Sequence, residues 1–482
     1  MLIDGELAYG EAGATFDNIN PATGAVLGPA PDANRADMEA AIAAARRAFD
    51  TTNWSTDHAR RQSCLRQLQA ALESEQEELR AELVAEVGCP VLSTYGPQLD
   101  APLREALAWP AEMIDRFSWK RSLGAKDAFG MGTESEREVW REAVGVVGTI
   151  TPWNFPIEII LNKLGPLLAM GNTCVLKPAP DTPWNATRLA RLIHDKTDIP
   201  PGVVNIVVSS DHSLGEVLAA SPLVDMVAFT GSTATGRNVM VAAAGNLKSV
   251  FLELGGKSVN LFLDDADLAA TIPSAAGACF HAGQGCAIPT RLLVPAARYD
   301  EAVDLAVAAM AAVTYGDPTD PSKFMGPLIS ERQQTRVLDH IESARRDGAR
   351  VALGGGTPAH LPDGFYVEPT LLADVDNAMA VAQQEVFGPV LVVTAFDDDD
   401  DAVRIANDSS YGLSGMITSG DLDRAKAVAG RIRTGTLGLN GGIWYGADAP
   451  FGGYKQSGTG RQCGIEGLEL FTEVKTVGWP AT

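Results

Sequence analysis

Three short motifs in this chain carry side chains that could together do chemistry at a carbonyl carbon. Cys286 ends the run Gly-Gln-Gly-Cys, Glu253 begins the run Glu-Leu-Gly-Gly-Lys-Ser, and Asn154 lies within Thr-Pro-Trp-Asn-Phe-Pro. A thiol can act as nucleophile, a carboxylate as general base, and an amide N–H as oxyanion donor. The combination therefore predicts covalent catalysis in which Cys286 attacks a carbonyl carbon. Each motif is marked by Gly or Pro beside an apolar run, which is typical of loops that present functional side chains.

The remaining cysteines fit a simpler interpretation, because a cysteine is more often a small buried apolar residue than a nucleophile. Cys279, shortly before Cys286, is interpreted as core, with a reversible disulfide to Cys286 as the alternative. His281 lies between them, so a Cys–His dyad is a second alternative. The buried interpretation applies most directly to Cys64, Cys89 and Cys174.

The run Phe229–Gly236 has the composition of a phosphate-binding turn. It follows a predicted strand and opens a predicted helix, so its glycines allow close backbone approach and helix N–H groups could attract phosphate oxygens. The run nearly matches a P-loop, but Arg237 and Asn238 stand where Lys and Ser or Thr are needed. ATP binding is therefore not expected. On these residues alone, an ordinary helix-opening turn is the alternative.

Hydrophobic periodicity indicates the elements that position these motifs. Helices are predicted at 34–50 and 59–88. From Val144 to Leu254, short apolar runs alternate with helical stretches, which predicts βαβ units and a parallel sheet buried on both faces. Such sheets bind ligands beyond the carboxyl ends of their strands. The strands predicted for this stretch and for a second α/β stretch after it are Val144–Ile150, Thr173–Leu176, Val203–Val208, Met226–Thr230, Val250–Leu254, Leu261–Leu263, Arg291–Val294, Val390–Thr394, Met416–Ile417 and Thr436–Leu439.

Composition limits the classes of partner. A net charge of −23 argues against nucleic acid and against anionic membrane surfaces. The six cysteines are scattered without metal-ligand spacing, which predicts reduced thiols and no metal site. No apolar run reaches the roughly 18 residues of a spanning helix, and no secretion signal is seen at the start. We therefore expect a cytoplasmic protein. The acidic run Asp397–Asp401 predicts a helix opening at Ala402, with a calcium site as the less favoured alternative.

These motifs and their order resemble the aldehyde dehydrogenase superfamily, from Asn20–Gly24 to Phe471–Lys475. The resemblance implies an α/β fold with a Rossmann-like parallel-sheet cofactor domain, a second α/β catalytic domain and a small β oligomerisation element. It also implies a homo-oligomer, either a dimer or a tetramer. The expected ranges are 1–122 and 143–252 for the dinucleotide-binding domain, 253–450 for the catalytic domain, 123–142 and 469–482 for the oligomerisation hairpin and tail strand, and 451–468 for an anchor loop and return segment.

The resemblance implies oxidation of an aldehyde to a carboxylic acid with reduction of NAD(P). Cys286 would form a thiohemiacetal whose oxygen is held by the Asn154 amide and the Cys286 N–H. Loss of hydride would leave a thioester, which water activated by Glu253 would hydrolyse. Lys163 matches a family lysine that assists the proton relay. The alternatives are a CoA-acylating dehydrogenase, a cysteine-dependent esterase or thiol hydrolase without redox chemistry, and a catalytically silent homologue.

By the same resemblance, Ser232 would contact the pyrophosphate, Lys177 the adenosine ribose and Glu385 the nicotinamide ribose. NAD is favoured as cofactor. NADP stays open, because Pro180 stands where many NAD-preferring members carry a glutamate that repels a 2′-phosphate, although Asp211 could restore some repulsion. The full set of expected cofactor residues is Trp153, Lys177, Gly231, Ser232, Gly236, Leu254, Glu385 and Phe387.

The substrate channel is expected from positions that match family loops. Its aromatic residues favour a medium-sized or aromatic aldehyde over a strongly charged one, and Asn162 replaces an aromatic residue of some acetaldehyde-oxidising relatives. No arginine adjoins Cys286, so aldehydes that carry a carboxylate are less favoured, although Arg291 is near in sequence. The expected channel residues are Phe155, Asn162, Trp444, Tyr445 and Phe451.

Overall fold

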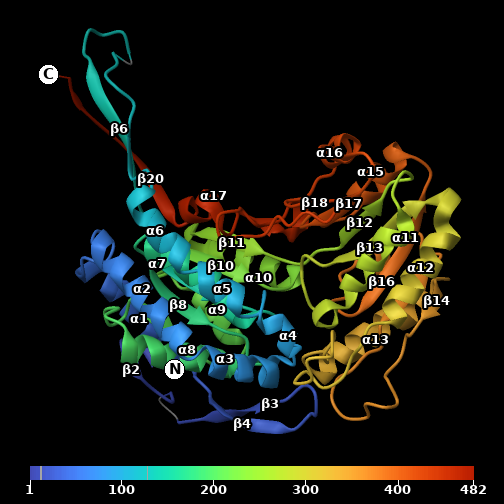
Figure 1. Ribbon diagram of the computed structural model, residues 1–482. Helices are drawn as coiled ribbons and strands as arrows, with labels where there is room; N and C mark the ends of the chain where they lie inside the picture. Colours follow the sequence, from blue (N-terminus) through green and yellow to red (C-terminus); the bar gives the residue numbers. More distant parts are fainter. Residues whose placement is uncertain (11–12, 128, 482) are drawn as a thin grey trace.

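The computed structural model describes residues 1–10, 13–127 and 129–481. Two open β-sheets, each flanked by helices, form the body, and a β-ribbon projects from it (Figure 1). In that view the first sheet and its blue and green helices lie to the left, and the second sheet lies to the right. The α/β class expected from the sequence is confirmed.

The first sheet has eight strands in the order β19-β11-β10-β7-β8-β9-β1-β2. Its five central strands, β11 to β9, are parallel. Because helices cover both faces, β8, β9 and β10 are buried along their whole length, which explains their apolar sequences. The strands are β1 (Leu2–Ile3), β2 (Glu6–Leu7), β7 (Val146–Ile150), β8 (Thr173–Lys177), β9 (Val204–Ile206), β10 (Met226–Thr230), β11 (Ser249–Glu253) and β19 (Gly458–Thr459).

The central strands end along one edge, and this edge brings predicted motifs together. Ile150 is in register with Lys177, and Thr230 is in register with Glu253. The turns that follow β7, β10 and β11 therefore begin side by side, at the edge where ligands of parallel sheets bind.

Helices cover both faces of the first sheet. α1, α9 and α10 contact one another and the sheet on one side, whereas α7 and α8 pack on the other with α2 and α6 outside α7. The helices are α1 (Arg35–Thr51), α2 (His58–Ser74), α3 (Gln76–Glu82), α4 (Val91–Thr94), α5 (Asp100–Glu105), α6 (Ala108–Arg116), α7 (Pro156–Ala169), α8 (Pro183–Lys196), α9 (Ser213–Ala220) and α10 (Thr233–Ala243).

The single helix predicted at 59–88 is wrong in one respect, because the structure divides it into α2, α3 and a π-helical turn, Leu83–Val87. Glu75, at the first break, has non-helical backbone angles (φ −121°, ψ 28°). Its carboxylate forms ion pairs with Arg188 and Arg191 of α8. These ion pairs explain the break in the helix, and local periodicity cannot reveal them because their partners lie on a distant helix.

The second sheet has seven strands in the order β14-β15-β16-β13-β12-β17-β18, parallel except for the β14–β15 pair. β14 and β15, each of four residues, were not predicted, although the equally short β17 was. The strands are β12 (Ser258–Phe262), β13 (Pro289–Pro295), β14 (Arg350–Leu353), β15 (Thr370–Ala373), β16 (Val390–Phe396), β17 (Gly415–Thr418) and β18 (Gly438–Leu439).

One face of the second sheet contacts α12 and a 3₁₀ segment, η3, and the other contacts α15 and α16. Each face has its own hydrophobic cluster, and a third cluster surrounds the first sheet. The bounds are α11 (Leu268–Thr271), η3 (Ile272–Gly283), α12 (Tyr299–Ala311), α13 (Glu331–Arg346), α14 (Ala380–Gln383), α15 (Asp399–Asn407), α16 (Leu422–Ala429) and α17 (Gly464–Glu469).

The acidic run opens α15, as expected, although the helix begins at Asp399 and not at Ala402. Asp398 caps it by accepting a hydrogen bond from the backbone N–H of Asp401 (2.9 Å). Three carboxylates of the run form ion pairs with arginines, so the arginines balance their charge and no metal ion is needed for that. Among the described side chains, no group of three or more His, Cys, Asp or Glu is arranged to hold a metal ion.

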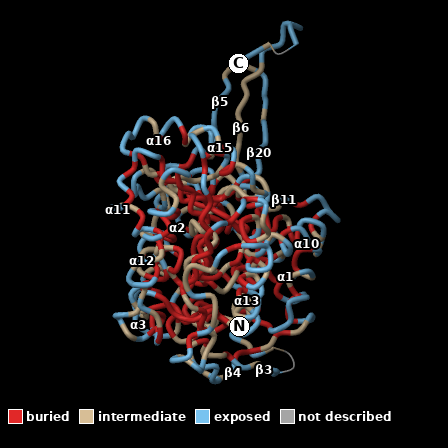
Figure 2. The backbone as a smooth tube through the Cα atoms, turned by 90° about the vertical axis from the view of Figure 1, so that its right-hand side faces the viewer, coloured by how far each residue is buried: buried red, intermediate tan, exposed pale blue. Residues whose placement is uncertain are grey.

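The projecting ribbon is a three-stranded sheet in the order β20-β6-β5. β6 and β20 pair antiparallel along nine residues, and Figure 2 shows that the ribbon extends well beyond the body. β20 is mostly exposed, whereas β6 is mostly half-buried. A separate hairpin joins β3 and β4. The bounds are β3 (Thr15–Ile19), β4 (Val26–Pro31), β5 (Lys120–Ser122), β6 (Ser135–Ala143) and β20 (Thr472–Pro480).

The domain ranges given above stay predictions. Residues 11–12, 128 and 482, which fall within those ranges, lie outside the described residues. A search of the described helices finds none with the length and apolar character needed to cross a membrane.

Candidate active site

Cys286 follows a turn whose backbone admits little variation. η3 ends in three residues with positive φ, namely His281 (49°), Ala282 (53°) and Gly283 (71°). A Cβ added at Gly283 would lie 2.0 Å from the carbonyl oxygen of Gly388. Glycine is therefore required there both for the left-handed backbone and for the close approach of a neighbouring chain segment.

The buried side chain of Gln284 holds the same turn in place through its hydrogen bonds. Its Nε2 donates to the carbonyl oxygens of His281 and Pro327 (both 3.2 Å), and its Oε1 accepts from the N–H of Ile329 (2.9 Å). Its own carbonyl oxygen accepts a hydrogen bond from Asn154 Nδ2 (2.9 Å). These contacts hold the Asn154 amide against the turn that presents Cys286.

Asn154 lies in the loop that connects β7 to α7. Pro156 occupies the first turn of α7, where a missing N–H costs nothing. The carbonyl oxygen of Asn154 accepts from Gln98 Nε2 (3.0 Å), so backbone and side chain are both held. The amide has a second N–H, which can donate to a ligand while the first stays on Gln284.

Glu253 is the last residue of β11, and its side chain is buried, with 2% of the residue exposed. Burial raises the pKa of this carboxyl above its ordinary range, while the charge of Lys163 and a hydrogen bond with the Cys286 thiol act in the opposite direction. Burial and the negative charges of Glu253, Glu385 and Glu158 raise the pKa of the Cys286 thiol. The resting thiol is therefore protonated at neutral pH, and a base must remove its proton for attack.

Lys163 is fully buried on α7, with Nζ 4.5 Å from the centroid of the Phe251 ring. Within the described residues Nζ has no hydrogen-bond partner. Burial lowers the pKa of the Lys163 ammonium, while the charges of Glu253 and Glu158 raise it. Its protonation is thus linked to that of the two carboxyl groups.

A cleft of ≈ 1150 Å³ runs from these residues along the carboxyl edge of the first sheet. It has the size of a ligand site, and Asn154, Glu253 and Cys286 line it. Seven of the eight residues predicted to hold a cofactor line the same cleft: Trp153, Lys177, Gly231, Ser232, Leu254, Glu385 and Phe387.

Glu385 and Phe387 reach this cleft from the loop that precedes β16. Glu385 Oε1 accepts from the N–H of Gly256 (3.0 Å), and a Cβ on Gly255 would lie 2.2 Å from Glu385 Oε2. The rings of Trp153 and Phe387 meet edge to face, with centroids 5.4 Å apart. Burial raises the pKa of the Glu385 carboxyl to about 7. The Gly-Gly pair of the Glu253 motif therefore makes room for a second carboxyl group.

Lys177 and Ser232 form the other end of the cleft. Lys177 ends β8, and burial lowers the pKa of its ammonium to about 8, against the opposing charge of Asp211. Ser232 caps α10, and its Oγ accepts from the N–H of Thr235 (3.2 Å). A helix N-terminus beside a buried lysine can bind phosphate and ribose oxygens.

The cofactor-binding role predicted for Gly236 stays a prediction, since Gly236 is not among the described residues that line the cleft. A Cβ at Gly236 would lie 2.6 Å from Cδ2 of Leu254. The glycine therefore lets α10 pack closely against Leu254, which does line the cleft. Its effect on the site is one of packing.

The five expected channel residues come together in two groups. Phe155 packs edge-on against His281, with ring centroids 5.3 Å apart. Asn162 Nδ2 donates to the Tyr445 hydroxyl (2.9 Å). Trp444 stacks on Phe451, with centroids 5.5 Å apart and ring planes 7° apart, and Tyr445 meets both rings edge to face. α7 thus connects an aromatic cluster in the C-terminal segment to the turn that bears Cys286.

The structure does not support either alternative for Cys286, namely a disulfide with Cys279 or a Cys–His dyad with His281. Cys279 is fully buried and is a free thiol, which fits its interpretation as a core cysteine. Burial lowers the pKa of His281 to about 4, and among the described side chains neither ring nitrogen hydrogen-bonds to Cys286. The buried His281 stays neutral and packs against Phe155.

Glu158 was missed by sequence analysis. Its Oε1 accepts from Asn162 Nδ2 (2.6 Å) and is hydrogen-bonded to the Tyr445 hydroxyl. Burial raises the pKa of the Glu158 carboxyl to about 7. A signal was available, because Glu158 and Asn162 are four residues apart and so lie on one face of α7.

Two arginines of α13, Arg332 and Arg336, and His212 also line the cleft without having been predicted. Arg336 donates to the carbonyl oxygens of Glu385 (2.6 Å) and Val386 (3.0 Å). No local signal marks the two arginines, because α13 has the sequence pattern of an amphipathic surface helix.

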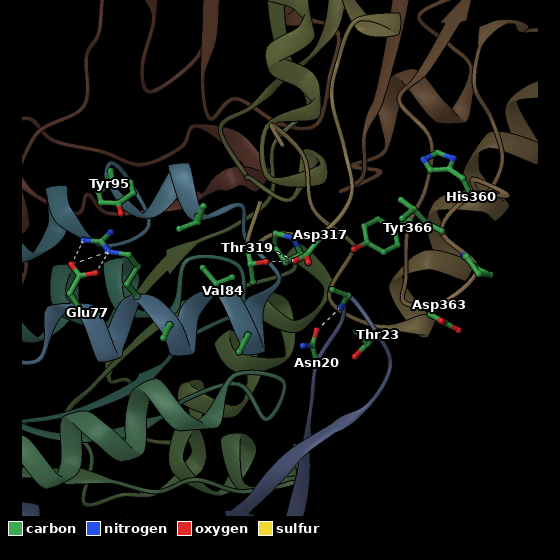
Figure 3. A pocket seen from close by; sticks show the side chains of 18 residues that line it. Asn20, Thr23, Glu77, Val84, Tyr95, Asp317, Thr319, His360, Asp363 and Tyr366 are labelled. Atoms are coloured by element: carbon green, nitrogen blue, oxygen red, sulfur yellow. Dashed lines mark hydrogen bonds and ion pairs between the residues drawn. The ribbon is translucent and has the colours of Figure 1, made fainter. Parts of the chain in front are cut away.

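A second pocket, of ≈ 760 Å³, lies between α3, the β3–β4 turn and the loops near 317–319 and 360–366 (Figure 3). Its one arginine, Arg80, is paired with Glu77 and Asp100 and stacks on Tyr95 at 4.0 Å. It contains no cysteine and none of the residues predicted to be catalytic. Of these two pockets, only the first cleft contains residues that the sequence predicts to be catalytic.

Comparisons with known proteins agree with this geometry. A family model described as the aldehyde dehydrogenase family matches residues 9–477. The 3-succinoylsemialdehyde-pyridine dehydrogenase of a Pseudomonas species is 41% identical over 99% of this chain and 98% of its own. The mitochondrial aldehyde dehydrogenase of Homo sapiens is 38% identical over 96% of this chain and 88% of its own.

Solved structures are equally similar. A Mycobacterium tuberculosis aldehyde dehydrogenase complexed with NAD+ superposes with a TM-score of 0.93 and 40% identity, covering 98% of this chain and 96% of its own. The betaine aldehyde dehydrogenase of Staphylococcus aureus, in complex with NAD+, gives a TM-score of 0.95 at 34% identity, covering 99% and 94%.

The fold and the cleft define a two-sheet α/β enzyme with a cysteine at the carboxyl edge of a dinucleotide-type sheet. The chain belongs to the aldehyde dehydrogenase family. The predicted family and the predicted oxidation of an aldehyde to an acid are confirmed, and neither CoA-acylating nor purely hydrolytic chemistry is favoured.

Proposed function

We propose that Cys286, Glu253 and Asn154 carry out this oxidation as nucleophile, general base and oxyanion donor, with NAD as the hydride acceptor. The observation that carries the proposal is their meeting in one cleft with the residues suited to a dinucleotide. The relatives from Mycobacterium tuberculosis and Staphylococcus aureus were solved with NAD+, which supports NAD.

The residues present fit a dinucleotide. Lys177 would bond the adenosine ribose, the capped N-terminus of α10 at Ser232 would receive the pyrophosphate, and Glu385 would bond the nicotinamide ribose. When bound, the dinucleotide supplies the site that accepts hydride. Pro180 lines the cleft without a carboxylate, and Asp211, whose charge acts on Lys177, is not among the described residues that line it, so the choice between NAD and NADP is decided by assay.

In the first step, the Cys286 sulfur bonds to the carbonyl carbon while Glu253 takes the thiol proton. The carbonyl π electrons move to oxygen, which the free N–H of Asn154 and the Cys286 backbone N–H stabilise by about 3 kcal/mol each. The thiohemiacetal then loses hydride from carbon, and the C=O double bond re-forms as a thioester.

Before the second step, Glu253 releases the thiol proton to solvent and is ionised again. Glu253 then takes a proton from water as the water oxygen bonds to the thioester carbon. The C–S bond breaks, the acid leaves, and the Cys286 thiolate takes the proton back from Glu253. Lys163 acts as a positioning residue, because its charge lowers the pKa of Glu253 and so increases the fraction of ionised base.

The aromatic cluster of Trp444, Tyr445 and Phe451 supports a medium-sized or aromatic aldehyde as substrate. Cys286→Ala should abolish reduction of NAD by any aldehyde, while a panel of aldehydes assayed with NAD and with NADP defines both preferences. Free acid should form equally with and without CoA, because Glu253 directs the thioester to water. Oxidation at full rate by the folded Cys286→Ala protein would contradict the assignment.

We also infer a homo-oligomer assembled through the projecting ribbon. Phe129 and Met131 at its tip are 88% and 81% exposed, and Val474 and Trp479 on β20 are also exposed. Such apolar side chains on a long open sheet favour burial against a second copy. Light scattering of the protein and of a variant lacking the tip measures the assembly directly.

A further inference from the structure

We propose that Asp181 is the residue that makes this enzyme prefer NAD to NADP, by bonding the adenosine ribose and repelling a 2′-phosphate. The inference rests on the proposed function and concerns the ribose end of the same cleft. Asp181 lines that cleft, whereas Asp211 is not among the described residues that line it. Asp181 is a specificity-determining residue in this proposal and takes no part in the reaction at the carbonyl carbon.

The turn between β8 and α8 presents Asp181 to the cleft. The N–H of Thr182 donates to the carbonyl oxygen of Ala179 (3.4 Å), so Pro180 and Asp181 occupy the two central positions of a β-turn. Proline suits the first of these positions, because its ring fixes the backbone angle φ that the turn requires. Lys177 ends β8 just before this turn. The proline that lacks a carboxylate therefore holds the turn that supplies one.

The Asp181 carboxylate is free to bind a ligand. It forms no ion pair with a described residue, and no other described residue donates a hydrogen bond to it. The residue is half-buried. Burial raises the pKa of the Asp181 carboxyl, while the charges of Arg332 and His212 act in the opposite direction. Hydroxyl groups of a bound ribose would donate to its oxygens and so compensate for the partial loss of water.

The Asp211 carboxylate, by contrast, is already bonded on both oxygens. Oδ1 accepts from the N–H of Ser213 (2.7 Å), and Oδ2 accepts from the Ser213 hydroxyl (2.7 Å). These hydrogen bonds hold the carboxylate at the N-terminus of α9. Asp211 therefore affects the cleft through its charge, which acts on Lys177, and not through a free oxygen that could bond a ribose.

The other carboxyl groups that line the cleft are less suited to the adenosine ribose. Glu253 and Glu385 lie with Cys286, away from the end formed by Lys177 and Ser232. Glu216 lies on α9 and is exposed to solvent, where its charge is screened. Asp181 is the one that combines partial burial with a place in the loop that follows Lys177.

Cationic side chains make the discrimination necessary. Lys177, His212 and Arg332 line the cleft together with Asp181. Arg332 belongs to the first turn of α13 and forms no ion pair with another described residue. Without an opposing charge, these side chains would attract a 2′-phosphate. With Asp181 in place, the phosphate of NADP would meet a carboxylate where NAD offers a hydroxyl donor.

The test measures the dissociation constants of NAD and NADP by calorimetry, and kcat/KM for each dinucleotide with one aldehyde. Asp181→Asn keeps the size of the side chain and removes its charge. The preference for NAD over NADP should fall by about ten- to a hundredfold in both measurements. The kcat at saturating NAD should stay near that of the wild type, because Asp181 does not contact the reacting atoms.

The matched control is Asp211→Asn, which removes the same charge from a neighbouring loop and should leave the preference nearly unchanged. Adding Arg332→Gln to Asp181→Asn should remove part of the NADP affinity gained, because Arg332 is one of the cations left to hold the phosphate. An undiminished gain in the double variant would overturn the part assigned to Arg332.

Three results would overturn the role of Asp181. The first is an unchanged preference in an Asp181→Asn protein that is folded and still binds NAD. The second is an equal loss of preference in Asp211→Asn or Glu216→Gln, since the net charge of the region would then decide. The third is tighter binding of NADP than of NAD by the wild-type protein. If the wild type binds NAD but oxidises no aldehyde, the proposed function fails instead.

Discussion

Replacing Glu253 by glutamine should separate the two halves of the reaction. The amide has the shape of the carboxyl group and can keep a hydrogen bond with the Cys286 sulfur, so little structure is lost. Because the Glu253 charge raises the pKa of the Cys286 thiol, removing it lowers that pKa and partly offsets the missing base during attack. Hydrolysis of the thioester has no such compensation.

The expected decrease in the rate of hydrolysis follows from the role of Glu253 as general base. A positioned general base contributes about 10²–10⁴-fold, which corresponds to about 3–5 kcal/mol of activation free energy. Rapid mixing of the variant with excess aldehyde and NAD should give a burst of NADH absorbance close to one equivalent per site. A steady state slower than that of the wild type by at least about a hundredfold should follow.

The matched control is Glu342→Gln on the exposed side of α13, where the carboxylate only pairs with Arg345. It should reproduce the wild-type burst and steady state. Absence of a burst in Glu253→Gln, with both phases slowed alike, would show that Glu253 serves mainly in thiol activation and would refute the assigned role.

Other perturbations test the supporting residues. Lys163→Met removes the charge that lowers the Glu253 pKa, so the pKa rises and the acid limb of the pH–rate profile should move to higher pH. Asn154→Ala should lower kcat by about 10²–10³-fold, while NAD affinity, measured by fluorescence quenching, stays near that of the wild type. Gly283→Ala should lower the thermal unfolding midpoint measured by calorimetry, because φ of 71° costs about 1–2 kcal/mol with a Cβ and the Cβ collides with Gly388; an unchanged midpoint would contradict the packing argument.

Much of the fold follows from local pattern. The parallel strands of the first sheet are buried on both faces, so their apolar runs are visible in the sequence. β14 escaped detection because it is an edge strand without a buried apolar run, and β15 was missed although the equally short β17 was predicted. The break at Glu75 escaped because its ion pairs join segments more than a hundred residues apart in the chain.

The sequence by itself determined which residue types stand at the ends of the apolar runs, and so a candidate nucleophile, base and oxyanion donor could be predicted. Only the tertiary structure decided what surrounds them. Asn154 meets Gln284 across 130 positions, and Glu158 meets Tyr445 across 287. Local spacing cannot encode such contacts, because they depend on how two sheets and their loops pack. The same packing buries Lys163 beside two carboxyl groups, and burial sets the pKa values on which the chemistry depends.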